Sequence, residues 1–400
     1  MSTTISVPDL SDPALYSDGD PESIWRHLRA TAPLIWIPRS RGGFWAVTSY
    51  ALARTVLRDA TRFSSEGGMR LDADPRSVAA SAGRMLIVTD PPRHAELRRS
   101  MNTGFNPRTL RRIEASMRQV ARQAIDTALE QGECDLVELA SSLPVAVICD
   151  LLGVPPADRG FMLEMTRGAF GSDGETAGIQ AHSALLVYYA DLVRQRRRAP
   201  GDDVVSAMMQ TQVAGEPLAD VDLMLNCDGL ISGGNETTRH ATVGGLLALY
   251  SNPDQLARLR ADPALMPSAV AEVLRWTSPA QHVLRTATTD CELAGQAIRS
   301  GDRVTVWIPS ANQDAQVFDQ AGRFRIDRQN NRHLTFAAGN HTCIGAALAT
   351  AELRVTIEEM IRRVADVQPL TAPRRLRSNL IRGYQSAPVR LTARTDEPDG

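Results

Sequence analysis

Apolar residues recur every three or four positions along most of the chain, which is the spacing that one buried face of a helix produces. This pattern predicts helices over residues 50–58, 110–131, 136–152, 159–170, 178–198, 202–212 and 220–250, with another from residue 344 onward. Short apolar runs between turn residues predict strands over 34–37, 44–47, 283–284, 291–293 and 304–307, and a terminal hairpin over 378–392. Helices therefore dominate, and the predicted strands are few and short.

The apolar pattern is broken at the centre of the helix predicted over 220–250. The segment from Ser232 to Thr238 contains two glycines, a glutamate and two threonines in a helix that is expected to be largely buried. Each glycine inside a helix costs roughly 1 kcal/mol relative to alanine. A local rule broken in this way often marks a functional site. A kinked core helix with a polar contact to a second helix would explain the same residues.

A lone cysteine, Cys343, stands between a glycine-containing loop and the last long helix. Free N–H groups and the helix dipole favour a thiolate there, and a thiolate can bind iron. Around it are Phe336, Gly339, His341 and Gly345. A buried structural cysteine is the simpler interpretation of Cys343 alone. Zinc is a weaker alternative, because no second Cys-x-x-Cys or histidine cluster lies nearby.

Two further pairs of polar residues have helical spacing. Asp90 and the prolines after it suit the start of a helix, which would place His94 and Arg98 on one face. Glu272 and Arg275 are also one helical turn apart. Taken alone, each pair is most simply a solvated polar face, and an exposed ion pair contributes only about 0–1 kcal/mol.

Four motifs, taken together and in this order, resemble those of the cytochrome P450 family of haem-thiolate monooxygenases. They are Asp-Pro-Pro-x-His-x-x-x-Arg-Arg from Asp90, Gly-Gly-x-Glu-Thr from Gly233, Glu-x-x-Arg from Glu272, and Phe-x-x-Gly-x-His-x-Cys-x-Gly from Phe336. The resemblance covers about residues 34–393. One departure is Ala337, where the family more often has Gly or Ser.

The resemblance implies a fold and a domain organisation. The expected fold is the cytochrome P450 fold, which is mainly α: a helical bundle with a small β-rich region. Residues 1–400 are expected to form a single cytochrome P450 domain. About 1–20 and 395–400 are expected to be flexible.

The resemblance also implies roles for individual residues. Cys343 is expected to bind the iron of haem b (iron protoporphyrin IX). The other expected haem-binding residues are His94, Arg98, Arg285, Phe336, Gly339, His341 and Gly345. Glu236 and Thr237 are the expected catalytic pair, which would deliver protons for the activation of O2 in space left by Gly233 and Gly234. Glu272, Arg275 and Arg328 are expected to form a structural ion triad, with Arg323 as the alternative third member.

Composition limits the other possibilities. Charged residues make up 22% of the chain and the formal net charge is −2, which argues against general nucleic-acid binding. Neither a signal peptide nor an apolar run of membrane-spanning length is visible. Five cysteines without a pairing pattern fit a reducing compartment. We therefore expect a cytoplasmic protein without a membrane partner.

The resemblance finally implies partners and a reaction. No flavin or iron–sulfur motif is present, so electrons from NAD(P)H are expected to arrive through a ferredoxin reductase and a ferredoxin. The expected docking residues for an acidic ferredoxin are Arg99, Arg111, Arg112, Arg332 and Arg354. The reaction would insert one oxygen atom from O2 into a small organic substrate, free or bound to a carrier protein, in the tailoring of a secondary metabolite. Oxidative C–C, C–N or C–O coupling without oxygen insertion is the alternative, and a non-catalytic haem sensor is a third hypothesis.

Overall fold

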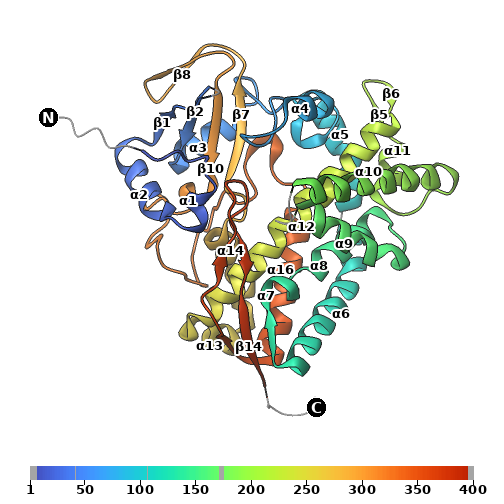
Figure 1. Cartoon of the computed structure of the whole chain (residues 1–400), viewed down its shortest axis with the longest axis vertical. Helices are drawn as coiled ribbons and strands as arrows, with labels where there is room; N and C mark the ends of the chain where they lie inside the picture. The colour runs from blue at the N-terminus through green and yellow to red at the C-terminus, as the bar shows by residue number, and fades with distance from the viewer. Residues whose placement is uncertain (1–6, 41, 106, 171–174, 395–400) are drawn as a thin grey trace.

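The structure is a computed structural model that describes residues 7–40, 42–105, 107–170 and 175–394. Helices form its larger part, and the longer strands gather beside them (Figure 1). The helices are α1 (Ala14–Ser17), α2 (Pro21–Thr31), α3 (Tyr50–Arg58), α4 (Pro75–Ser81), α5 (Arg93–Asn102), α6 (Pro107–Gln131), α7 (Leu136–Leu139), α8 (Ser142–Leu152), α9 (Arg159–Phe170), α10 (Glu175–Arg198), α11 (Val204–Met209), α12 (Asp220–Tyr250), α13 (Pro253–Ala261), α14 (Met266–Thr277), α15 (Ile308–Ala311) and α16 (Ala346–Arg363).

The main sheet has five strands in the order β1-β2-β10-β7-β3. These are β1 (Leu34–Ile37), β2 (Phe44–Val47), β10 (Arg303–Trp307), β7 (His282–Ala287) and β3 (Phe63–Ser64). β10 runs parallel to β2, with Val304 opposite Trp45, and antiparallel to β7. The sheet thus joins strands from the first and last thirds of the chain.

The remaining strands form smaller sheets. Three of them pair in the order β11 (Val364–Pro369), β14 (Pro388–Ala393) and β4 (Glu133–Asp135). Two-stranded pairs are β12 (Arg374–Arg375) with β13 (Tyr384–Ser386), β5 (Gln212–Val213) with β6 (Glu216–Pro217), and β8 (Cys291–Leu293) with β9 (Gln296–Ile298). The hairpin predicted over 378–392 is wrong, because β13 pairs with β12 whereas β14 pairs with β11. β14 pairs with β11 rather than with β13 because this pairing buries Val389 and Leu391 of β14 beside Val367 of β11.

The long helix α12 organises the helical part of the fold. Its 31 residues give it a length of about 46 Å at 1.5 Å per residue. It contacts α8, α10, α14 and α16, and most of its side chains are buried. Figure 1 shows it crossing the middle of the molecule beside α16, the helix that follows Cys343. The prediction of one helix over 220–250 is confirmed.

Part of the N-terminal segment packs against the main sheet. Leu10 and Tyr16 are buried, and the Tyr16 ring stacks on Trp307 of β10 at a centroid distance of 5.8 Å. The Tyr16 hydroxyl donates to the Leu10 carbonyl at 2.6 Å. Aromatic burial therefore packs Leu10 and Tyr16 against the sheet, whereas Asp9, Asp18 and Asp20 are exposed. Residues 1–6 and 395–400, the other parts of the predicted flexible ends, lie outside the described residues.

Within the described ranges, none of the helices combines the length and the apolar character that crossing a bilayer requires.

Candidate active site

Cys343 lies in the loop between Phe336 and α16. Its backbone N–H donates to the Phe336 carbonyl at 2.9 Å, which closes the loop. The helix begins at Ala346 with Gly345 as its N-cap, so Cys343 stands just before the helix. Surrounding protein raises the pKa of the Cys343 thiol, whereas the Gly345 N–H and the charge of Arg98 lower it. The raising effect is the larger, so the pKa of Cys343 lies above its ordinary value, and the two lowering contributions only partly offset the cost of the thiolate, which is the metal-binding form.

The backbone of this loop explains two of its residues. Gly339 has φ +75°, and a Cβ there would lie 2.6 Å from the Leu57 carbonyl oxygen. Glycine is thus required by the turn and by the close approach of α3. Ala337 has φ +57°, a conformation that glycine adopts more easily. At Gly345 a Cβ would lie 3.9 Å from Cys343 Sγ, an ordinary contact, so the described atoms do not require glycine there.

Four basic side chains from three parts of the chain meet near this loop. His94 of α5 packs against His341 with ring centroids 4.2 Å apart, and Arg98 donates to the Asn340 carbonyl at 3.4 Å. Burial, together with the charge of Arg285 on β7, lowers the pKa of His341 to about 3. Burial and the charge of Arg98 also lower the pKa of His94. Both imidazoles are therefore neutral at pH 7.

The segment before α5 corrects one expectation. The Asp90 carboxylate does not cap the helix, which begins three residues later at Arg93. It accepts instead from the Ser65 N–H at 2.9 Å and from the Ser64 hydroxyl. Asp90 thereby ties the end of β3 to the start of α5, which carries His94 and Arg98.

The centre of α12 presents two different faces. Gly233 is exposed, and a Cβ there would meet no atom within 4 Å. The Thr237 hydroxyl, one turn later, donates to the Gly233 carbonyl at 2.7 Å. Gly234 differs, because a Cβ there would lie 2.8 Å from Ile148 of α8. Of the two glycines predicted to leave space, only Gly233 does so; Gly234 allows two helices to pack.

Glu236 is buried on another face of α12. Its carboxylate pairs with Arg239, and His240 Nε2 lies 3.4 Å from its Oε2. The Asn235 amide donates to Oε1 at 3.4 Å. Sequence reasoning missed Arg239 and His240, although positions three and four after a buried acid are where its partners would be sought.

Glu272, Arg275 and Arg328 form a buried ion triad. Arg275 donates to both carboxylate oxygens, from Nη2 at 2.7 Å and from Nε at 2.8 Å, and Arg328 Nε donates at 2.9 Å. Arg323 contributes only its carbonyl, which accepts from Arg275 and Arg328. The Asn331 amide also donates to Glu272, at 3.0 Å, a contact that sequence spacing could not indicate.

Residues 177–377 match the family model of cytochrome P450. The chain is 37% identical over 392 residues to cytochrome P450 NovI of Streptomyces niveus, covering 96% of both chains. It is 38% identical over 405 residues to putative cytochrome P450 126 of Mycobacterium tuberculosis, covering 97% of this chain and 98% of that one. The crystal structure of P450 OxyD, which is involved in the biosynthesis of vancomycin-type antibiotics, is similar with a TM-score of 0.89, 37% identity, and coverage of 96% and 100%.

The chain belongs to the cytochrome P450 family. The family and the fold predicted from sequence are thus confirmed. As a P450 the protein is an enzyme, an oxidoreductase of the monooxygenase class, and its family cofactor is haem iron.

The side chains of this P450 fit such a group. His94 Nε2 and His341 Nε2 are buried without a hydrogen-bond partner among the described residues. Arg285 is only 5% exposed, and burial lowers its pKa to about 10. It donates to the Leu284 carbonyl at 2.8 Å and forms no ion pair within the described part of the chain. Donors held without an acceptor suit a carboxylate such as a haem propionate, and Cys343 offers an exposed thiol on the same loop as His341.

The predicted ferredoxin-docking residues are not all available. Arg112 pairs with Asp202 at 3.0 Å, and Arg354 pairs with Glu114 at 2.8 Å. Arg354 also pairs with Glu358 on its own helix. Two of the five proposed arginines are therefore committed to partners within the P450 itself.

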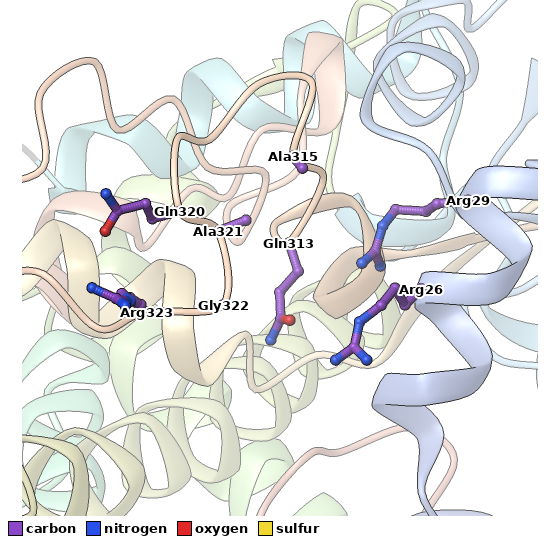
Figure 2. Close-up of a pocket in the computed structure, with 8 residues that line it drawn as sticks. All are labelled: Arg26, Arg29, Gln313, Ala315, Gln320, Ala321, Gly322 and Arg323. Atoms are coloured by element: carbon purple, nitrogen blue, oxygen red, sulfur yellow. The ribbon is translucent and has the colours of Figure 1, made fainter.

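A cavity of about 490 Å³ lies between α2 and the coil of residues 313–323. Figure 2 shows Arg26 and Arg29 extending from α2 toward Gln313. Its other lining residues are Ala315, Gln320, Ala321, Gly322 and Arg323. None of the lining residues is an expected haem-binding or catalytic residue, so this cavity is separate from the candidate active site.

Proposed function

We propose that this P450 inserts one oxygen atom from O2 into a small organic substrate, using electrons that a ferredoxin delivers from NAD(P)H. The observation that chiefly supports this proposal is the structure at the centre of α12. There the open face at Gly233 and Thr237 adjoins a buried, ion-paired Glu236. A proton donor and an acid beside accessible space are what oxygen activation needs.

The haem-binding residues follow from the same proposal. Cys343 would bind the iron of haem b, while His94, Arg98, Arg285 and His341 would hold its propionates. The buried donors of this cluster support the assignment, since a carboxylate would satisfy them. When bound, the haem iron supplies the activation of O2, and a thiolate ligand supplies electron density that favours cleavage of the O–O bond.

Glu236 and Thr237 would divide the handling of protons. The Thr237 hydroxyl now donates to the Gly233 carbonyl, and rotation about its side chain turns that proton toward the accessible face. Glu236 lies about 100° round the helix from Thr237. After taking up a proton from solvent water, the Glu236 carboxyl group would pass it to Thr237 by a side-chain rotation or through one water. Arg239 and His240 keep this carboxylate ordered until then.

The proposal extends to location, domain and partners. Five free cysteines suit the reducing cytoplasm. Relatives that align over nearly all of this chain support a single P450 domain. With Arg112 and Arg354 committed elsewhere, Arg99, Arg111 and Arg332 are the arginines proposed to meet an acidic ferredoxin. A secondary metabolite is the proposed substrate class, which the likeness to P450 OxyD supports.

Turnover in heavy-oxygen gas tests the reaction. A ligand screen first identifies a substrate from the low-spin to high-spin change of the haem. Reaction with that substrate, ferredoxin, reductase and NAD(P)H under ¹⁸O2 should then yield a product that carries one ¹⁸O atom. A product that lacks ¹⁸O but has lost hydrogen would show oxidative coupling instead. Parallel turnover in H2¹⁸O under ordinary O2 controls for exchange with water and should leave the product unlabelled.

A further inference from the structure

Behind the proposed catalytic acid lies a histidine that no motif indicated. His240 follows Glu236 by one helical turn and is only 1% exposed. Its Nε2 lies 3.4 Å from Glu236 Oε2. On the opposite side of the ring, the Tyr384 N–H of β13 donates to His240 Nδ1 at 3.3 Å. The imidazole thus stands between the acid and the backbone of a strand from the far C-terminal part of the chain.

These two contacts determine where the proton of the imidazole lies. A ring nitrogen that accepts a hydrogen bond carries no proton, so a neutral His240 holds its proton on Nε2. Burial lowers the pKa of His240, and the neighbouring charge of Arg239 lowers it as well, so the ring is neutral at pH 7. Glu236 and Arg239 are the charged groups that face it. The Nε2 proton therefore lies on the side of Glu236, 3.4 Å from Oε2, although Nε2 makes no hydrogen bond to any described residue.

The C-terminal strand also fixes the plane of the ring. A Cβ at Gly383 would lie 2.4 Å from His240 Cγ and 2.6 Å from Nδ1, so the backbone there packs directly on the imidazole. The Gly383 carbonyl accepts from the Leu376 N–H at 3.0 Å, which holds the β12–β13 pair in place. Only glycine leaves room for this contact, and the ring has little freedom to turn.

We propose that His240 is a positioning residue for Glu236: it accepts the backbone of β13 on Nδ1 and so holds its Nε2 proton beside the acid, in electrostatic contact rather than in a hydrogen bond. The strand that carries Tyr384 thereby sets the orientation of the proton-delivering carboxylate. The positioning role of His240 rests on the role proposed above for Glu236. The assignment of the His240 proton to Nε2 is independent of that proposal.

The first test reads the ring directly and needs no turnover. The haem-loaded protein in its reduced, carbon monoxide-bound form is labelled with ¹⁵N-histidine and studied by long-range ¹H–¹⁵N NMR. The signal that disappears in His240→Asn identifies residue 240. We expect an unprotonated Nδ1 and a protonated Nε2. Neither should change between about pH 6 and 8, the interval in which an ordinary histidine titrates. A proton on Nδ1, or titration in that interval, would overturn the proposal.

The second test uses variants that separate orientation from packing. His240→Leu keeps the volume of the side chain but can neither accept a hydrogen bond from Tyr384 nor offer a proton to Glu236. It should lower the turnover number about ten-fold and leave KM unchanged. This loss is smaller than the loss expected on removing a positioned acid altogether. His240→Asn keeps an acceptor for the Tyr384 N–H, but its amide is too short to place a proton beside Glu236, so its turnover should lie between those of the wild type and His240→Leu. Gly383→Ala substitutes no residue of α12, but its added Cβ displaces the His240 ring. This variant should therefore resemble His240→Leu.

Gly322→Ala is the matched control, because a Cβ there meets no atom within 4 Å. It should keep wild-type turnover. Equal turnover in the wild type, His240→Leu and Gly383→Ala would refute the positioning role. If no variant and no wild-type protein turns over any substrate, the proposed function fails, and the NMR result alone decides the proton position of His240.

Discussion

Glu272 and Arg275 face each other in a two-pronged ion pair with distances of 2.7 and 2.8 Å, and neither side chain has any exposed surface. Arg275 Nη1 also donates to the carbonyls of Asn312 and Ala321 at 2.9 Å. The pair thus fastens the coil that leads to Phe336 and Cys343 onto α14. A charge buried this completely is tolerated only because every partner is in place.

Removing the acid should therefore unfold this region. Glu272→Ala leaves two buried guanidinium groups without their carboxylate, and we expect a loss of about 3–5 kcal/mol in the free energy of unfolding. Denaturant unfolding and the haem content of purified protein measure the effect. The exposed Glu292→Ala should change stability by less than about 0.5 kcal/mol. Recovery of normal holoenzyme from Glu272→Ala would contradict this view.

The third member of the triad gives a sharper comparison. Arg328→Ala removes the Nε donor to Glu272 and should destabilise the protein strongly. Arg323→Ala keeps the backbone carbonyl, which is the only part of that residue in the triad, and should be nearly neutral. Equal losses of stability in the two variants would show that the hydrogen bonds do not account for the effect.

Cys343 is expected to give the spectrum of a thiolate ligand. The reduced protein with carbon monoxide should show a strongly red-shifted Soret band, because the Cys343 thiolate donates electron density to the iron. Cys343→His should abolish that band. Cys291→Ser, which changes a half-buried cysteine of β8, should retain it. A wild-type band like that of a histidine-ligated globin would exclude the ligand assignment.

Thr237→Ala should uncouple the enzyme without preventing binding. The hydroxyl at the open face of α12 is lost, so NAD(P)H would be consumed mostly to form hydrogen peroxide. Glu236→Gln should instead slow the whole cycle, by about 10²-fold if proton delivery is lost. The ratio of product to NAD(P)H consumed, with peroxide assayed in parallel, measures both.

Thr242→Ala is the control for that comparison. Its hydroxyl makes the same kind of contact, to the Thr238 carbonyl at 2.9 Å, but on a buried part of α12. It should retain coupling. Wild-type coupling in Thr237→Ala would remove the role proposed for Thr237.

Arg285→Met should affect the haem-free and haem-loaded forms in opposite directions. Burial lowers the pKa of Arg285 from 12.5 to about 10, a shift that corresponds to about 3 kcal/mol of unfavourable burial of the charge at neutral pH. Replacing the unpaired cation should therefore stabilise the haem-free protein. The same change should speed haem transfer to apomyoglobin, because a propionate loses its partner. Arg299→Met, at an exposed surface pair, should do neither.

Stability should depend on pH with opposite signs at two buried groups. Burial lowers the pKa of His282 from 6.5 to about 4, so only the unfolded chain binds this proton between those values. Relative to His282→Gln, the wild type should lose up to about 1.4 kcal/mol per unit as pH falls from 6.5. Burial raises the pKa of Glu352 from 4.5 to about 8, so there the folded protein holds the extra proton.

Relative to Glu352→Gln, the wild type should therefore lose stability as pH rises from about 4.5 to 8. Denaturant unfolding of the haem-loaded proteins at about pH 5, 5.5 and 6, which lie between the folded and unfolded values of both groups, compares the slopes. Slopes of the same sign for the two variants would contradict the assignment of either group.

The sequence by itself determined several of the elements and the family. The strands over 34–37 and 44–47 and the helices over 50–58 and 220–250 have the predicted bounds, because hydrophobic periodicity is a local property that neighbouring residues impose on each other. The family motifs likewise lie in short stretches. Even Glu236 could be singled out locally, as an acid in an otherwise buried helix.

Only the tertiary structure decided which distant residues meet. His94, Arg285 and His341 come together through the packing of α5, β7 and the Cys343 loop. The choice of Arg328 over Arg323 depends on which side chain reaches Glu272, and the need for glycine at 234 and 383 depends on Ile148 and His240. Residues so far apart in sequence share no local period, so their contacts exist only after the chain has packed.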